Sequence, residues 1–300
     1  MAINEDQLKT WSNTGADKGS AISYNRVKSI IENSNFSKKN GVDIFIQGSY
    51  ANTTHVRSDS DVDVVVKLNT IWNGDLSKLT DHERQEYERH TSESDYGHDE
   101  LRQELIKIFK EFLGNKNVEE HKKCIRLILG NSYLNTDIIP CLSYRIYNSF
   151  SSTKQTDYIE GIAIKKTDGT IIYNFPKQHI NNGIKKHQNT REYYKKIIRI
   201  IKNMRNRLLD EGKLQQNIAP SYFIECLYYN IPDENFGNSL QNSVLNSLNW
   251  ILGNKEKINN LKCQNEVTHL FGSEETQWSI SDCCTFLIVL SKIFMEKEDA

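Results

Sequence analysis

The sequence lacks several patterns that would assign it to a specialised class of protein. None of its apolar runs is long enough to cross a bilayer, and no basic region followed by an apolar one opens the chain, so we expect a cytoplasmic protein with no membrane partner. The six cysteines show no CxxC spacing and the eight histidines form no pair with a third ligand, which argues against a disulfide framework and structural zinc. A formal net charge of −1 argues against binding of long nucleic acids, because such binding depends on clustered positive charge.

The most informative stretch runs from residue 44 to residue 66. An apolar segment ends in Gly48-Ser49, and a later polar segment leads through Asp61 and Asp63 into a run of valines. Because side chains alternate faces along a strand, Asp61 and Asp63 should point the same way, about 7 Å apart. Two neighbouring carboxylates usually need a divalent cation to offset their repulsion. Asp59 shares their parity, but its Ser-Asp-Ser setting favours a turn-capping role.

Hydrophobic periodicity predicts an α+β protein in which a mixed sheet is followed by helices. Strands are expected at residues 42–47, 62–68, 124–129, 133–139, 159–165 and 170–173. Helices are expected in a broken segment over 4–33 and at 99–113, 190–209, 220–229, 239–252 and 281–296. We expect the polar residues 69–97 to be a mobile surface excursion, with residues 78–90 as its only helical candidate. The change from strand signals to helix signals at about residue 180 predicts two lobes, a core of residues 1–180 and a helical domain of residues 181–300. The active site is expected in the cleft between them.

A third carboxylate is predicted to complete the acid pair. The expected strands 124–129 and 133–139 form a hairpin, and Asp137 lies on its second strand. A neighbouring strand could place Asp137 beside Asp61 and Asp63. Three acids can hold two Mg²⁺ ions, or Mn²⁺ in their place, about 3.5–4 Å apart for phosphoryl transfer. An ordinary exposed strand position is the alternative for Asp137.

Phosphate contacts are predicted at the Gly48-Ser49 turn. A glycine lets backbone amides approach phosphate oxygens closely, and the Ser49 hydroxyl adds a donor. The pair is weak evidence alone and becomes specific when the acid pair follows it.

The helical half is predicted to supply cations and a surface for the base. Lys195, Arg199 and Lys202 share one helix face, and we predict that Lys202 contacts a phosphate, although such faces are often simply solvated. Ser221 offers a hydroxyl to a phosphate and Tyr222 an aromatic ring to a base, with a core position as the alternative for Tyr222.

These motifs occur in an order that resembles a known superfamily. The order is Gly48-Ser49, Asp61-x-Asp63, Asp137, Arg199-x-x-Lys202 and Ser221-Tyr222. It resembles the polymerase-β-like nucleotidyltransferases and, within them, the bacterial cGAS/DncV-like nucleotidyltransferases (CD-NTases), over nearly the whole chain. The resemblance implies a two-lobed fold and a template-free, Mg²⁺-dependent synthesis. In the reaction that the resemblance implies, a 3′ or 2′ hydroxyl would attack the α-phosphate of a nucleoside triphosphate, and a second attack would close a ring.

On this resemblance we expect a cyclic oligonucleotide synthase, with a cyclic dinucleotide as product and pyrophosphate released. The product would be an antiphage (CBASS) signal read by a separate effector protein. Two alternatives are transfer of a nucleotide to an RNA or protein acceptor, and a non-catalytic nucleotide-binding module. Binding alone would not need three carboxylates, which argues against the second alternative.

Overall fold

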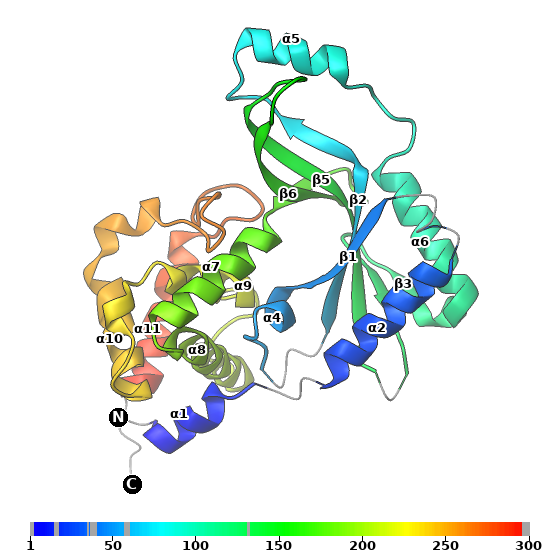
Figure 1. The fold of residues 1–300 in the computed structure, drawn as a ribbon. Helices are drawn as coiled ribbons and strands as arrows, with labels where there is room; N and C mark the ends of the chain where they lie inside the picture. Colours follow the sequence, from blue (N-terminus) through cyan, green and yellow to red (C-terminus); the bar gives the residue numbers. More distant parts are fainter. Residues whose placement is uncertain are drawn as a thin grey trace. The chain divides into compact units, whose positions relative to one another are not determined.

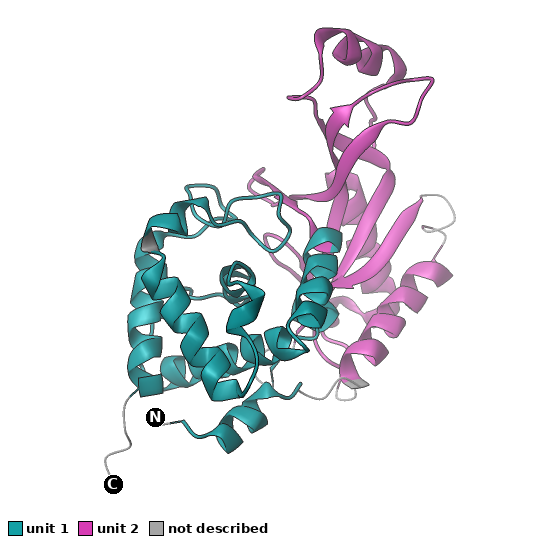
Figure 2. Cartoon of the chain, turned by 60° about the vertical axis from the view of Figure 1, so that its left-hand side comes forward, with its two compact units in different colours: residues 1–17, 48–60, 177–300 teal, residues 18–47, 61–176 magenta. Residues whose placement is uncertain are grey.

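A computed structural model of the chain describes residues 3–14, 18–34, 36, 41–56, 61–130 and 133–295 (Figure 1). Backbone contacts divide the chain into two compact units (Figure 2). The sheet unit comprises residues 18–47 and 61–176, and the helical unit comprises residues 1–17, 48–60 and 177–300. Within the described ranges, no helix has both the length and the apolar character that spanning a membrane would need.

The sheet unit is built on one mixed sheet with the strand order β1-β2-β5-β4-β3; β6 pairs with β5, and β7 pairs with β6. The strands are β1 (Val42–Gln47), β2 (Val62–Asp75), β3 (Val118–Glu120), β4 (Ile125–Leu127), β5 (Thr136–Ser149), β6 (Asp157–Lys165) and β7 (Ile171–Asn174). Only the β2–β5 pair is parallel among these strands. The helices α2 (Lys18–Asn33) and α6 (His98–Leu113) pack against each other, α2 on β2 and α6 on β5 (Figure 1). The mixed sheet confirms the α+β class.

Alternation along β2 explains why this strand is central. Val62, Val64 and Val66 are fully buried on one face of the strand. Val65 lies on the opposite face, in a second apolar cluster with Ile139 and other residues of β5, β6 and β7. Apolar side chains therefore cover both faces of β2 at residues 64–66, and the polar side chain of Asp63 lies just before them.

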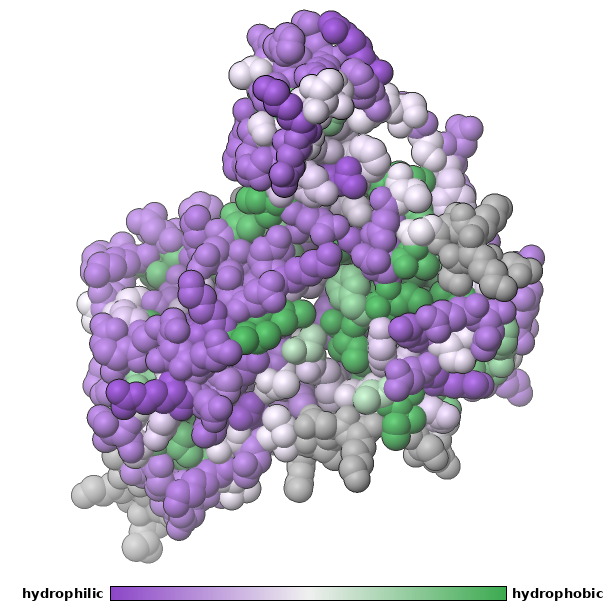
Figure 3. All heavy atoms as spheres, viewed as in Figure 1, coloured by the Kyte–Doolittle hydropathy of each residue, from purple (hydrophilic) through white to green (hydrophobic). Residues whose placement is uncertain are grey.

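The polar segment 69–97 forms regular structure, which corrects the expected mobile excursion. β2 runs on to Asp75 because β5 completes its hydrogen bonds from Trp72 onwards, and the expected helix at 78–90 is present as α5 (Asp81–His90). The Trp72 indole N–H donates to the Tyr87 hydroxyl (3.1 Å), and the Tyr87 ring packs edge-on against Tyr147 at 5.3 Å between ring centres. An aromatic cluster that local periodicity did not reveal thus supports residues 69–97, which we call the extension and whose outer surface is largely hydrophilic (Figure 3).

The helical unit is organised around one large apolar core. Its helices are α1 (Glu5–Ser12), α4 (Gly48–Ala51), α8 (Tyr193–Asp210), α9 (Ser221–Tyr229), α10 (Leu240–Gly253) and α11 (Ile280–Met295), joined by most of α7 (Pro176–Asn189). The apolar positions of α8 recur at helical spacing, so Ile197, Ile201 and Met204 are all fully buried in this core. The helices expected beyond residue 190 are confirmed, and α7 precedes them.

Candidate active site

The three predicted acids lie on one face of the sheet. In the parallel ladder Asp63 of β2 is directly opposite Asp137 of β5, so their side chains point to the same face. Asp61 immediately precedes β2 and is two residues from Asp63, which gives it the same parity. We call these residues the acid face. The sequence predicted the Asp61–Asp63 relation, and the β2–β5 pairing supplies the third member.

Two carboxylates of the acid face have raised pKa values. Burial is the largest cause of a pKa of about 6 for Asp63; the charge of Lys123 opposes it, and the charges of Asp137 and Asp61 add to it. Burial also raises the pKa of Asp61, against the opposing charge of Arg126. A cation at this face would therefore favour the ionised form of carboxylates that burial and neighbouring acids disfavour.

Arg126 provides such a cation, and the sequence reasoning missed it. It lies on β4 directly opposite Asp137. Its Nε donates to Asp137 Oδ1 at 2.9 Å, and its Nη2 donates to Asp61 Oδ2 at 2.5 Å and to Asp137 Oδ2 at 3.3 Å. The available signal was a single basic residue between Ile125 and Leu127 on the strand expected to pair with that of Asp137.

The acid face carries the type of donor that a hard divalent cation prefers. Mg²⁺ prefers carboxylate oxygens, and three carboxylates project from one face. Across the described part of the chain, no three His, Cys, Asp or Glu side chains are gathered as a ready-made metal site. The Arg126 guanidinium lies between the carboxylates of Asp61 and Asp137. Asp59 is outside the described residues.

The Gly48-Ser49 turn begins α4 in the helical unit. Gly48 has a φ of 73°, a left-handed conformation that favours glycine. The Ser49 carbonyl accepts a hydrogen bond from Thr54 N at 2.9 Å, which ties the turn to the segment 52–54. The backbone conformation at position 48 therefore favours the glycine that the sequence has there.

The basic face of α8 packs on the segment 52–54. Lys195 Nζ donates to Thr53 Oγ1 at 3.2 Å, Arg199 Nη1 donates to the Thr53 carbonyl at 2.5 Å, and Lys202 Nζ donates to the Thr54 carbonyl at 3.1 Å. All three basic side chains are buried. Helical spacing correctly placed them on one face, and this face anchors the residues that follow Gly48-Ser49. Direct contact of Arg199 or Lys202 with a phosphate stays a prediction.

Glu225 is the buried centre of this anchor. Its carboxylate accepts from Lys202 Nζ (2.7 Å), Thr54 Oγ1 (2.6 Å), His179 Nε2 (2.9 Å) and Asn52 Nδ2 (3.1 Å). Burial alone would raise its pKa, but the Lys202 ammonium and His179 hold the pKa well below its usual range. The sequence reasoning did not single out Glu225, because an acid on a largely apolar helix has no local pattern that marks it.

Ser221 and Tyr222 begin α9, as predicted. Ser221 Oγ accepts from Arg205 Nη2 at 3.2 Å. The Tyr222 ring stacks on His179 at 4.8 Å and lies 5.6 Å from Trp278, and its hydroxyl accepts from Asn265 Nδ2. Protein side chains thus already pack around Tyr222, and stacking on a base stays a prediction.

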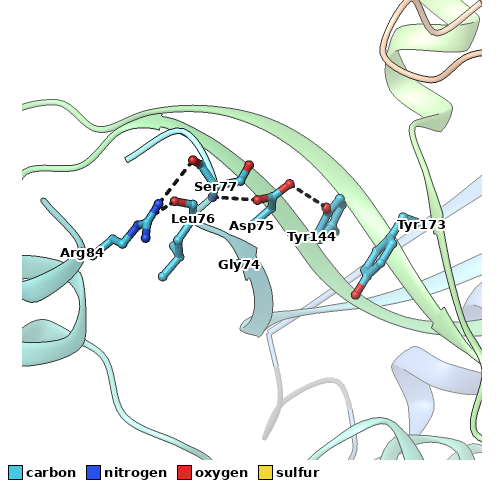
Figure 4. A pocket seen from close by; sticks show the side chains of 7 residues that line it. All are labelled: Gly74, Asp75, Leu76, Ser77, Arg84, Tyr144 and Tyr173. Atoms are coloured by element: carbon cyan, nitrogen blue, oxygen red, sulfur yellow. Dashed lines mark hydrogen bonds between the residues drawn. The ribbon is translucent and has the colours of Figure 1, made fainter. Parts of the chain in front are cut away.

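A separate cavity of about 550 Å³ lies in the extension of the sheet unit. Gly74, Asp75, Leu76 and Ser77 line it together with Arg84, Tyr144 and Tyr173 (Figure 4). The Tyr144 and Tyr173 rings stack at 4.0 Å, and the Tyr144 hydroxyl donates to Asp75. Tyr144 lies roughly 23 Å along β5 from Asp137, so this cavity is distinct from the acid face.

Comparisons of this chain with a family model, with known sequences and with solved structures all find relatives of one kind. The family model described as the cGAS/DncV-like nucleotidyltransferase C-terminal helical domain matches residues 181–295. The cyclic nucleotide synthase CdnE01 of Staphylococcus haemolyticus is 35% identical over 301 residues, covering 99% of this chain and 100% of that protein. The Rhodothermus marinus CdnE c-UMP-AMP synthase, solved with Apcpp and Upnpp, has a TM-score of 0.89 at 31% identity, covering 99% of this chain and 98% of that one. The Elizabethkingia meningoseptica CdnE cyclic dinucleotide synthase, solved with GTP and Apcpp, has a TM-score of 0.78 at 27% identity, covering 98% and 100%.

Proposed function

Because the chain belongs to the cGAS/DncV-like nucleotidyltransferases, we propose that it joins two nucleoside triphosphates into a cyclic dinucleotide without a template and releases pyrophosphate. The names of the relatives support cyclic nucleotide synthesis. The observation that carries the proposal is the in-register pairing of Asp63 with Asp137, which brings three acids to one face.

The acid face is the catalytic centre in this proposal. The carboxylates of Asp61, Asp63 and Asp137 would hold two Mg²⁺ ions, or Mn²⁺ in their place. Bound there, these ions would lower the pKa of the attacking hydroxyl and neutralise charge on the triphosphate. We assign to Asp137 the acceptance of the proton from the attacking 3′ or 2′ hydroxyl, because Asp137 is the acid that the neighbouring strand β5 brings opposite Asp63.

The nucleotide-binding residues of the proposal come from the helical unit. Gly48, Ser49 and Ser221 are assigned to phosphate. Arg199 and Lys202 are also assigned to phosphate, and their hydrogen bonds to the segment 52–54, which is tied to the Gly48-Ser49 turn, support this assignment. Tyr222, at the beginning of α9, is assigned to the base.

The proposal keeps the division into a nucleotidyltransferase core of residues 1–180 and a helical domain of residues 181–300. The match of the C-terminal helical domain family to residues 181–295 supports this division. We further assign the protein to the cytoplasm and its product to antiphage (CBASS) signalling through a separate effector protein. Family membership is the support for this role.

The test is incubation of purified protein with all four ribonucleoside triphosphates and Mg²⁺, without nucleic acid. All four are offered because the structurally similar synthases were solved with nucleotides or analogues of more than one base. Mass spectrometry should detect a cyclic product that survives phosphatase, together with pyrophosphate. Omission of Mg²⁺ in the presence of EDTA should abolish the product.

A double variant, Asp61→Asn with Asp63→Asn, should abolish the product while its circular dichroism stays that of the wild type. Asp157→Asn is the matched control, because Asp157 is an exposed acid opposite Ser149, at the other end of β5 from Asp137. A product that forms only when RNA or a protein acceptor is added would replace cyclisation with acceptor transfer.

A further inference from the structure

The Arg126 guanidinium occupies the oxygens that a divalent cation would need. Its three hydrogen bonds reach Asp61 Oδ2 and both carboxylate oxygens of Asp137. Guanidinium and carboxylate match in planar, bidentate geometry, so these contacts are stronger than those of a point charge. A metal ion and Arg126 would therefore compete for the same ligands.

The backbone position of Arg126 makes this competition a property of the fold. Arg126 is opposite Asp137 in the β4–β5 ladder, so the two side chains share a face of the sheet. The Arg126 side chain is 31% exposed and that of Asp61 39% exposed, whereas that of Asp137 is 18% exposed. A partly exposed guanidinium can turn away without a change in the ladder that holds its backbone.

Resting on the proposed function, we propose that Arg126 is a resident counter-ion that divalent cations must displace from the acid face. In the metal-free protein it offsets repulsion between Asp61 and Asp137. Displacement of Arg126 costs part of the binding energy of the cation, so the free protein binds divalent ions weakly. A triphosphate that brings additional oxygen ligands with the ion makes the exchange favourable.

The test measures Mn²⁺ binding to the nucleotide-free protein by isothermal titration calorimetry and electron paramagnetic resonance. Arg126→Gln should bind Mn²⁺ about 10-fold more tightly than the wild type, since charge-assisted hydrogen bonds no longer oppose the ion. Arg126→Lys keeps the charge and loses the planar fork, so its affinity should lie between the two. Arg207→Gln is the matched control, because Arg207 makes an exposed ion pair with Glu211, and its affinity should equal that of the wild type.

Circular dichroism verifies that each variant is folded. Mn²⁺ affinity of Arg126→Gln equal to or weaker than that of the wild type overturns the inference. If Arg126→Gln does not fold, Arg126→Lys decides, and an affinity no tighter than wild type overturns it equally.

The outcome is separable from that of the proposed function, because no nucleotide or turnover is involved. Cyclic product from the wild type with unchanged Mn²⁺ affinity in the variants would remove this inference alone. Tighter Mn²⁺ binding by the variants with no product from the wild type would remove the proposed function alone.

Discussion

Replacement of Glu225 by Gln tests whether the buried carboxylate network anchors the segment 52–54. The Glu225 side chain is 4% exposed and that of Lys202 is fully buried, at 0%. The variant keeps the shape of the side chain and removes its charge. It also turns one acceptor oxygen into an amide donor that faces other donors.

The expected loss follows from the charge that remains. The Lys202 ammonium would stay buried without its carboxylate partner, and breaking such a buried pair costs about 3–5 kcal/mol. No screening reduces this figure, because solvent barely reaches either side chain. We therefore expect the free energy of unfolding of the variant to fall by about 3–5 kcal/mol at pH 7.

The effect should depend on pH. Because the folded-state pKa of Glu225 lies below the ordinary value of 4.5, its contribution is present above pH 4.5 and is lost as the pH falls towards the folded-state pKa. Urea denaturation at pH 7 and at about pH 3 should therefore show a smaller difference between wild type and variant at the lower pH. The apparent KM for nucleoside triphosphates should also rise, since the segment 52–54 loses a support.

Glu211→Gln is the control, since Glu211 forms exposed ion pairs at the end of α8 and its loss should change stability little. A loss below about 1 kcal/mol for Glu225→Gln at pH 7, or a difference that does not vary with pH, would refute the reasoning. An unchanged KM with the full loss of stability would limit Glu225 to a structural role.

Three further predictions concern substitutions in the sheet unit. Asp63→Asn should stabilise the metal-free protein by about 1–3 kcal/mol above pH 6 and leave its stability unchanged below pH 3.8. The reason is that the pKa of Asp63 in the folded state is raised from 3.8 to about 6, and thermal denaturation as a function of pH measures the difference in stability. Asp137→Asn should lower kcat by about 10²–10⁴-fold through loss of the proton acceptor. Gly161→Ala should destabilise the fold by about 1–3 kcal/mol in urea denaturation, since a Cβ would lie 2.7 Å from the Asn174 carbonyl oxygen and 2.8 Å from the Phe175 ring.

For each of these substitutions, one result would contradict the prediction. Asp63→Asn with wild-type stability at every pH would show that burial does not disfavour the ionised Asp63 carboxylate. A wild-type kcat in Asp137→Asn would assign the proton to another group. Gly169→Ala is the comparison for Gly161→Ala, because its Cβ would meet no atom within 4 Å and only its left-handed backbone, with a φ of 89°, opposes the change. Wild-type stability in Gly161→Ala would show that the close approach of β7 to Gly161 is not limiting.

The sequence by itself determined the local features. Period-two alternation put Asp61 and Asp63 on one face, and β1 was predicted at its observed bounds, Val42–Gln47. Helical spacing put Lys195, Arg199 and Lys202 on one face of α8. Ordered motifs were enough for the α+β class and for the family, because the spacing of such motifs is a property of the chain itself.

The tertiary structure decided which of these local features meet. The parallel pairing of β2 with β5 brings Asp137 opposite Asp63, and the β4–β5 pairing brings Arg126 between the acids. It also turned the basic face of α8 inward, onto Glu225 and the segment 52–54. Periodicity tells which side chains share a face, but the partner of that face is chosen by hydrogen bonds and packing between residues far apart in the chain.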